Sequence, residues 1–158
     1  METGRATELA IRYLLVSLFF PFSALDKVLN FDGAVSQARE MAPDDTSAKA
    51  MILAGLAVEV GAPVAILTGR FDRLAALVMA GYCGATAVLF KRFWEPGDFW
   101  RPGPSRGRDL FWDFMKNFSL AGGYLLITFG TRAGAARGFL ADPFSSTRPY
   151  DKGARARP

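Results

Sequence analysis

The sequence predicts an all-α membrane protein: an antiparallel bundle of four transmembrane helices with both termini on the same side of the membrane. Apolar residues make up 51% of the 158 residues, and they gather in long stretches separated by segments rich in Arg, Asp, Gly and Pro. The stretch 74–90 contains no charged residue and approaches the length that crosses a hydrocarbon core. Helices of a soluble bundle would instead mix polar and apolar residues with a helical period.

The first two helices are expected at about residues 9–30 and 48–68. An apolar run follows Arg12, a pattern that is also typical of a cleaved signal peptide, and this alternative stays open at the sequence level. The second helix contains many Ala and Gly residues and one carboxylate, Glu59. Small residues at helical spacing let membrane helices approach closely. Between the two helices, 31–47 is expected to be a polar connection because it contains acidic residues, Gly and Pro.

The other two helices are expected at about residues 73–93 and 109–130. The basic turn Gly69–Arg73 is so short that the helices on either side of it must be antiparallel. The uncharged part of the fourth helix, 117–131, is short for a membrane span. The loop before this helix contains three aromatic residues that are expected at the membrane interface: Trp94, Phe99 and Trp100.

Residues 131–158 form a polar, Arg-rich tail that is expected to be disordered unless a partner or the membrane surface orders it. With four spans, the N-terminus, the basic turn at 69–73 and this tail lie on the same side of the membrane. Lys and Arg residues are somewhat more numerous on that side, and the short basic turn favours the cytoplasm. We therefore expect both termini in the cytoplasm.

The composition excludes several classes of function. The chain contains no histidine and one cysteine, so its own side chains provide no His-ligated haem or zinc, no Ser-His or Cys-His nucleophile and no intrachain disulfide. We expect no metal site. The net charge of +4 comes from basic residues near the ends of apolar runs and in the tail, which suits contact with anionic lipid. No nucleic-acid-reading motif is present, so nucleic acid is not an expected partner.

Ionisable residues gather in the outer half of the expected bundle, with Glu59 near the bilayer centre. A charge inside a membrane costs about 3 kcal/mol even on the more permissive insertion scale, so these groups are expected to face inward and pair. Lys27 is expected to pair with Glu59, and Lys116 with Asp113 or Asp26. The candidate cluster contains Asp26, Lys27, Glu59, Asp113, Lys116 and Asn117, with Tyr82 and Cys83 as candidates for the lining of a pocket.

Three interpretations of this cluster stay open. Its ion pairs could act as a structural clamp that holds short helices in register. Alternatively, they could form a polar pocket for a quinone head group, a proton path or a site for a small sulfur compound. The lysines could also simply extend to the membrane interface. Cys83 alone favours a packing role, because buried cysteines in helices usually pack as small apolar residues.

Five segments occur in an order that resembles the DoxX family of small four-helix bacterial membrane proteins. The resemblance covers about residues 9–130, and no single motif carries it. The segments are Phe22–Val28, Glu59–Gly61, Gly69–Ala76, Phe93–Trp94 and Lys116–Gly123.

The resemblance implies a multi-pass protein of the bacterial cytoplasmic (inner) membrane. The family resembles a set of accessory subunits linked to redox systems, including quinone-linked thiosulfate oxidation and terminal quinol oxidation. Members commonly carry a histidine near the end of the third helix, around Lys91 here, and this chain lacks it. A function that requires that imidazole is therefore not expected. The basic tail resembles an addition to the family pattern.

Our first hypothesis is a non-catalytic accessory subunit of a larger bacterial redox or energy-converting complex. It would contact lipid and other membrane subunits, with the tail at 131–158 as a candidate contact. It would bind no cofactor alone, with quinone as the candidate exception. The second hypothesis is a quinone- or sulfur-linked oxidoreductase subunit in which Lys27, Glu59 and Lys116 bind or protonate the substrate. A small transporter has less support, because no inverted repeat is detectable.

Overall fold

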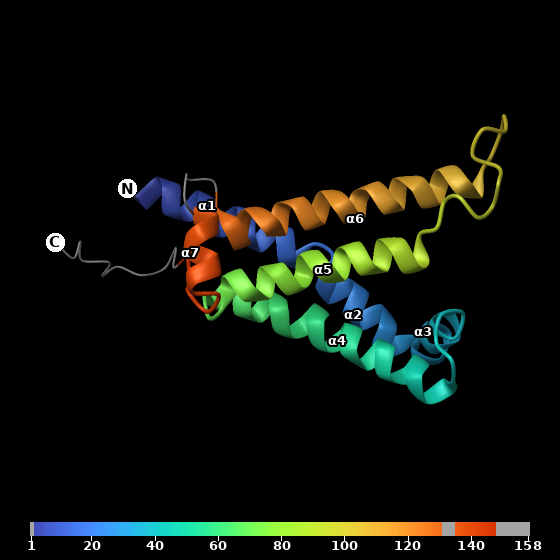
Figure 1. The fold of residues 1–158 in the computed structure, drawn as a ribbon, viewed down its shortest axis with the longest axis horizontal. Coiled ribbons are helices and arrows are strands. Elements are labelled where there is room, and N and C mark those ends of the chain that lie inside the picture. Colours follow the sequence, from blue (N-terminus) through green and yellow to red (C-terminus); the bar gives the residue numbers. More distant parts are fainter. Residues whose placement is uncertain (1, 131–134, 148–158) are drawn as a thin grey trace.

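A computed structural model describes residues 2–130 and 135–147, and the secondary structure of this part is helical, without strands (Figure 1). Its helices are α1 (Glu2–Ser17), α2 (Phe20–Leu29), α3 (Phe31–Ala38), α4 (Asp45–Thr68), α5 (Asp72–Phe90), α6 (Arg106–Phe129) and α7 (Ala135–Ala141). Three segments are long and apolar enough to cross a membrane, namely Ala6–Leu29, α4 and α5. The predicted all-α class is confirmed for the described residues.

The first predicted helix is interrupted at Leu18 and Phe19, so that α1 and α2 replace the single helix expected over 9–30. Pro21 lies at the start of α2, where its ring and its missing N–H prevent a regular continuation from the preceding turn. The break frees backbone carbonyls of α1. Tyr124 of α6 donates a hydrogen bond from its hydroxyl to the carbonyl oxygen of Leu15, at 3.0 Å.

The expected polar connection at 31–47 contains a short helix, α3, that was not anticipated from the sequence. Val35 and Ala38 lie three residues apart on one face of α3 and are buried against Ile52 of α4. This short apolar face stabilises α3 although the surrounding sequence is polar. The side chain of Asp44 then accepts a hydrogen bond from the backbone N–H of Ser47 and caps α4.

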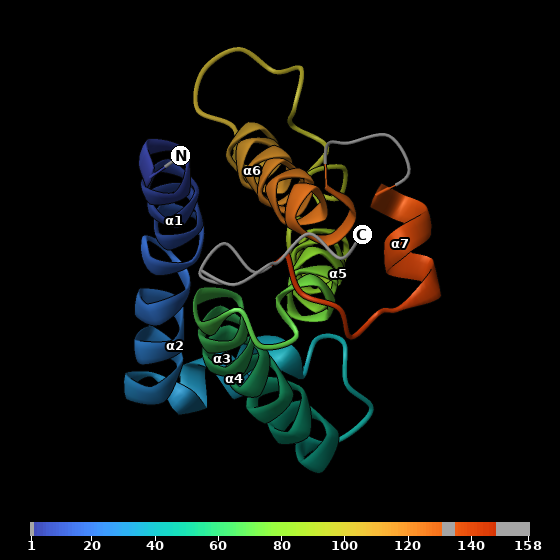
Figure 2. The same ribbon diagram turned by 90° about the vertical axis from the view of Figure 1, so that its left-hand side faces the viewer.

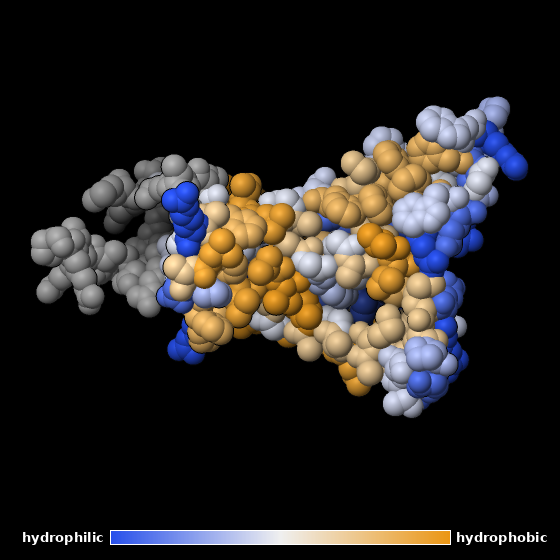
Figure 3. Space-filling view, viewed as in Figure 1, coloured by the Kyte–Doolittle hydropathy of each residue, from blue (hydrophilic) through white to orange (hydrophobic). Residues whose placement is uncertain are grey.

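The central helix is α5, which packs against α4 on one side and α6 on the other, while α1 and α2 lie along the side of the bundle (Figures 1 and 2). Side chains from all five helices form the main core. Much of the face drawn in Figure 3 is apolar, and hydrophilic residues gather at its two ends. The membrane-embedded helices therefore contact the lipid bilayer along their sides.

The start of α1, the α4–α5 turn and α7 lie at one end of the molecule, and α3 and the α5–α6 loop lie at the other (Figure 1). In the described part of the tail, 135–147, the expectation of disorder was wrong. Phe139 is 5% exposed, packs against Phe129, and lies beneath the guanidinium of Arg73. The Ser146 hydroxyl donates to the carbonyl of Gly69 at 2.8 Å. The rest of the predicted tail lies outside the described residues.

Candidate functional site

A cavity of about 600 Å³ lies between α2, α3, α4 and α5, with α6 contributing at one side. This volume is within the usual range for small-molecule pockets. In Figure 3 it is visible as a hollow surrounded by apolar residues, with a hydrophilic residue inside. The cavity therefore combines apolar walls with a localised polar group, an arrangement typical of ligand sites.

The polar group at the inner end of the cavity is the carboxylate of Glu59, which is 2% exposed. Lys27 forms an ion pair with it, with distances of 2.8 and 3.0 Å from Nζ to the two carboxylate oxygens. The hydroxyls of Ser23 and Tyr82 donate to Oε1 at 2.9 and 2.8 Å. This set of partners offsets much of the cost of burying a carboxylate among apolar helices.

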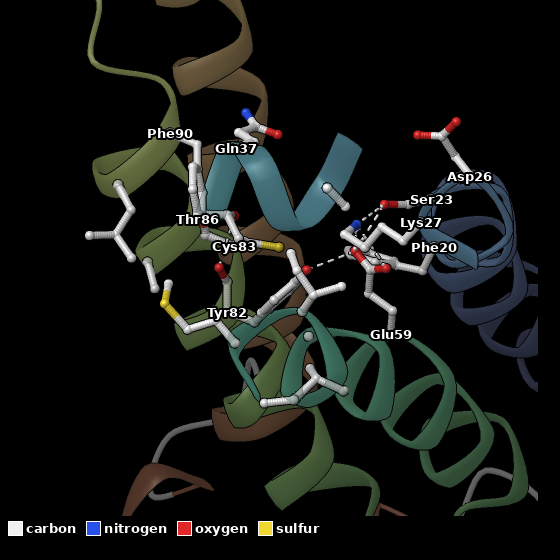
Figure 4. Close-up of a pocket in the computed structure, with 18 of the residues that line it drawn as sticks. Phe20, Ser23, Asp26, Lys27, Gln37, Glu59, Tyr82, Cys83, Thr86 and Phe90 are labelled. Atoms are coloured by element: carbon white, nitrogen blue, oxygen red, sulfur yellow. Dashed lines mark hydrogen bonds and ion pairs between the residues drawn. The ribbon is translucent and has the colours of Figure 1, made fainter. Parts of the chain in front are cut away.

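Helix geometry brings these partners together from three elements (Figure 4). Ser23 and Lys27 are four residues apart in α2, so they share a face, and Lys27 Nζ donates to Ser23 Oγ at 2.7 Å. Tyr82 approaches from α5. Gly55 of α4 leaves room for it, because a Cβ at this position would lie 3.2 Å from the Tyr82 hydroxyl oxygen.

A second set of polar residues lies at the end of α5 and in the first half of α6. Lys91, at the end of α5, and Lys116 both form ion pairs with Asp113 of α6, at 3.2 and 3.3 Å. Asn117 lines the cavity and donates from its amide to the carbonyl oxygen of Asp113, at 3.2 Å. Lys116 does not line the cavity, and its side chain is 74% exposed.

The predicted cluster thus separates into an inner and an outer group. Glu59, Lys27 and Tyr82 meet at the inner end, while Asp113, Lys116 and Asn117 lie together on α6. Asp26 lines the cavity but is exposed, points away from Glu59 (Figure 4) and accepts a hydrogen bond from Asn30 at 2.7 Å rather than pairing with Lys116. Cys83 lines the cavity as well and is 1% exposed.

Two members of the site, Ser23 and Lys91, were not predicted from the sequence. Ser23 could have been found from its position four residues before Lys27, because such a spacing places both side chains on one helix face. Lys91 lies just past the end of α5, and its contact with Asp113 depends on how α5 and α6 pack. No local pattern in the sequence indicates that contact.

A second buried charge cluster lies at the opposite end of the bundle and was also missed. Arg12 of α1 and Asp72 at the start of α5 are 3% and 0% exposed, and their ion pair measures 2.6 Å. Thr147 of the tail contacts both side chains through its hydroxyl, and Glu8 forms an ion pair with Arg12 at 3.0 Å. This cluster joins the N-terminal helix, the α4–α5 turn and the tail.

The sequence profile of the DoxX family matches residues 7–92. The chain belongs to the DoxX family. It is also similar to the inner membrane protein YphA of Escherichia coli (strain K12), with 29% identity over 124 residues that cover 78% of this chain and 83% of YphA. No solved structure matches the chain.

The predicted family resemblance is therefore confirmed, as is the predicted localisation in a bacterial inner membrane. The matched segment includes most of α1, all of α2–α5, and with them the inner group Ser23, Lys27, Glu59 and Tyr82. The three apolar helical segments agree with a protein that crosses this membrane several times.

Proposed function

We propose that this DoxX-family protein is an accessory subunit of a membrane redox complex and that its cavity binds the head group of a small amphiphile of the quinone class. One observation carries the proposal: a cavity of about 600 Å³ ends at a buried, fully partnered carboxylate and is otherwise mostly apolar. An amphiphile with a compact polar head and an apolar tail matches this polarity.

The accessory role is supported by the chemistry that the chain itself carries. Its sequence contains no histidine and a single cysteine, so electrons for a reaction at the cavity would have to come from a partner. Purification from the native membrane in a mild detergent tests this part. We expect other membrane subunits to co-purify in fixed stoichiometry, whereas a lone chain would contradict the accessory role.

The proposal includes four membrane crossings with both termini in the cytoplasm. The fourth is α6, whose 24 residues are about 36 Å long, enough to cross the hydrocarbon core beside α5. Its charged residues all lie in its first half, and the two that lie deepest in the helix, Asp113 and Lys116, pair with each other. Labelling of single cysteines introduced at Gly4 and Gly97 tests this topology in right-side-out vesicles with Cys83 changed to Ala. We expect an impermeant maleimide to label only the second position.

Binding to the cavity is tested with the purified full chain and a decyl-chain benzoquinone in its oxidised and reduced forms. We expect at least one form to bind, and Glu59→Gln to weaken that binding at least tenfold. The substitution removes the negative charge that pairs with Lys27 and replaces one of the two acceptor oxygens with an amide donor. Lys116→Met is the matched control: it also removes one charge, but at an exposed position outside the cavity. Unchanged binding per folded molecule in Glu59→Gln would favour a purely structural clamp.

A further inference from the structure

We infer that the inner end of the cavity accepts hydrogen bonds and does not donate them, so that it selects a head group bearing hydroxyl groups. For a quinone-type ligand, the selected form is the reduced hydroquinone. This inference rests on the proposed function, because it concerns the ligand of the same cavity. It follows from counting where each polar hydrogen at the inner end is already used.

The carboxylate of Glu59 determines the direction of the hydrogen bonds around it. An ionised carboxylate can only accept, so the hydroxyls of Ser23 and Tyr82 must each use their one hydrogen to bond Oε1. The hydroxyl oxygens of both residues are then left with lone pairs alone. A ligand that approaches either oxygen must supply the hydrogen itself.

The ammonium group of Lys27 is committed in the same way. It carries three hydrogens and has three acceptors around it: Ser23 Oγ at 2.7 Å and the two oxygens of Glu59 at 2.8 and 3.0 Å. Each hydrogen therefore has an acceptor within the protein. The ammonium group of Lys27 therefore points toward Glu59 and has no hydrogen left for a ligand.

The next polar residue along the cavity follows the same pattern. The Thr86 hydroxyl lies 2.9 and 3.0 Å from the backbone carbonyl oxygens of Tyr82 and Cys83, and its one hydrogen can bond to only one of them. Its lone pairs are left for a ligand. Cys83 carries a thiol, which is a weak donor and cannot replace a hydroxyl or an amide.

Side chains with uncommitted hydrogens line other parts of the cavity. Asn30, one turn beyond Lys27 in α2, uses one amide hydrogen on Asp26 and keeps the other. Gln37 on α3 carries an amide, and Figure 4 places it away from Glu59. Lys91 and Asn117 each use one hydrogen on Asp113 and keep others. The groups that can still donate therefore lie away from Glu59, and the side chains that contact Glu59 can only accept. A carbonyl oxygen placed at the inner end would face only lone pairs, while a hydroxyl there would be satisfied.

The test compares three ligands that differ only at the head-group oxygens: a decyl-chain benzoquinone, its hydroquinone kept under argon, and the dimethyl ether of that hydroquinone. Dissociation constants are measured by equilibrium dialysis on the full chain in detergent. We expect the hydroquinone to bind at least tenfold more tightly than the other two, because only it can donate. Tyr82→Phe removes one acceptor and is expected to reduce the ratio between the dissociation constants of the quinone and the hydroquinone. Tyr13→Phe, at an exposed position on α1, should leave this ratio unchanged.

The outcomes separate this inference from the proposed function. Equal or tighter binding of the quinone, or an ether that binds as tightly as the hydroquinone, overturns the inference but keeps the cavity as a binding site. Absence of binding by all three ligands overturns both. The wild-type comparison decides the question even if Tyr82→Phe fails to fold.

Discussion

Two buried carboxylates, Glu59 and Asp72, are held in closely similar ways at different places in the bundle. Each is at most 2% exposed, forms an ion pair with a cation from the N-terminal part of the chain, and accepts a hydroxyl hydrogen bond. The cations differ in enclosure. Arg12 is 3% exposed and covered by the tail, whereas the Lys27 side chain is 22% exposed and lines a cavity of about 600 Å³. Enclosure, rather than the type of contact, distinguishes the structural pair from the pair that a ligand can reach.

The difference in enclosure affects how much each ion pair contributes to the free energy of unfolding. Removing one partner of an enclosed ion pair leaves a charge that neither water nor a ligand can reach, while a pair beside a cavity can be partly solvated. The Arg12 pair is also less well satisfied, because its Nε is buried with no hydrogen-bond partner among the described residues. We therefore expect substitutions at the Arg12 pair to act on stability and substitutions at the Lys27 pair to act mainly on binding.

The largest effect is expected for Arg12→Met, which leaves the carboxylate of Asp72 buried without its cation. The free energy of unfolding in detergent should fall by about 3–5 kcal/mol, or the protein should fail to accumulate. Thermal unfolding followed by circular dichroism measures the change. Glu8→Gln is the control, since Glu8 is a half-exposed partner of the same guanidinium and its loss should change stability by less than about 1 kcal/mol. Equal effects of the two substitutions would contradict a special role for enclosure.

A smaller loss of stability is expected for Lys27→Met, about 1–3 kcal/mol, because the unpaired Glu59 can be hydrated from the cavity. The double variant Lys27→Met/Glu59→Gln should recover much of this loss, since neither charge remains buried without a partner. Binding of the hydroquinone should be lost in both. The same unfolding and dialysis measurements check the prediction. A double variant no more stable than Lys27→Met would contradict the idea that the unpaired charge of Glu59 is what destabilises the single variant.

How far the sequence predicts these features depends on the distance between the contacting residues. The Lys27–Glu59 contact could be anticipated from helix depth and the cost of an unpaired charge in lipid. The Arg12 and Thr147 contacts with Asp72 span 60 and 75 residues and require the tail to fold back onto a turn. No periodicity in a polar, Arg-rich segment indicates such a contact. Phe139, the apolar residue of the tail that anchors α7, has few apolar neighbours in the sequence.

The helix boundaries illustrate the same limit on a local scale. Hydropathy identified α4 and α5 as spans because their uncharged stretches are long. It overlooked the break at Leu18 and Phe19, since the residues around the break are as apolar as the helices. It also overlooked α3, because two buried residues on eight are too few to dominate a polar segment.

Gly55→Ala tests whether the position of the Tyr82 hydroxyl beside Glu59 matters for binding. The added Cβ would lie 3.2 Å from the Tyr82 hydroxyl oxygen and should displace it from Glu59 by a few tenths of an ångström. We expect hydroquinone binding to weaken about three- to tenfold, with a change in unfolding free energy below about 1 kcal/mol. Gly61→Ala, in the same helix but with no atom within 4 Å of its Cβ, is the control. Unaltered binding in Gly55→Ala would mean that the position of the Tyr82 hydroxyl does not matter.

The smallest effect is expected at a partly exposed carboxylate outside the membrane-spanning segments, Asp98. The backbone N–H groups of Gly107 and Arg106 donate to Asp98, both at 2.8 Å, and these bonds hold the pKa of its carboxyl below the ordinary range. A lowered pKa means that the cap of α6 contributes fully above about pH 4, the ordinary value for Asp, and is lost as the pH falls through the lower folded value.

Tryptophan fluorescence measures this transition, because the three tryptophans of the chain lie in or beside the α5–α6 loop. We expect an acid-induced change in emission below about pH 4 that is absent in Asp98→Asn. Asp44→Asn is the control: it also removes a helix-capping carboxylate, but at the start of α4, far from the tryptophans in the sequence. Both buried ion pairs lie outside this loop, so helix content followed by circular dichroism should remain constant through the same transition. Unfolding of the whole bundle together with the fluorescence change would contradict the expectation that loss of the Asp98 cap affects only this loop.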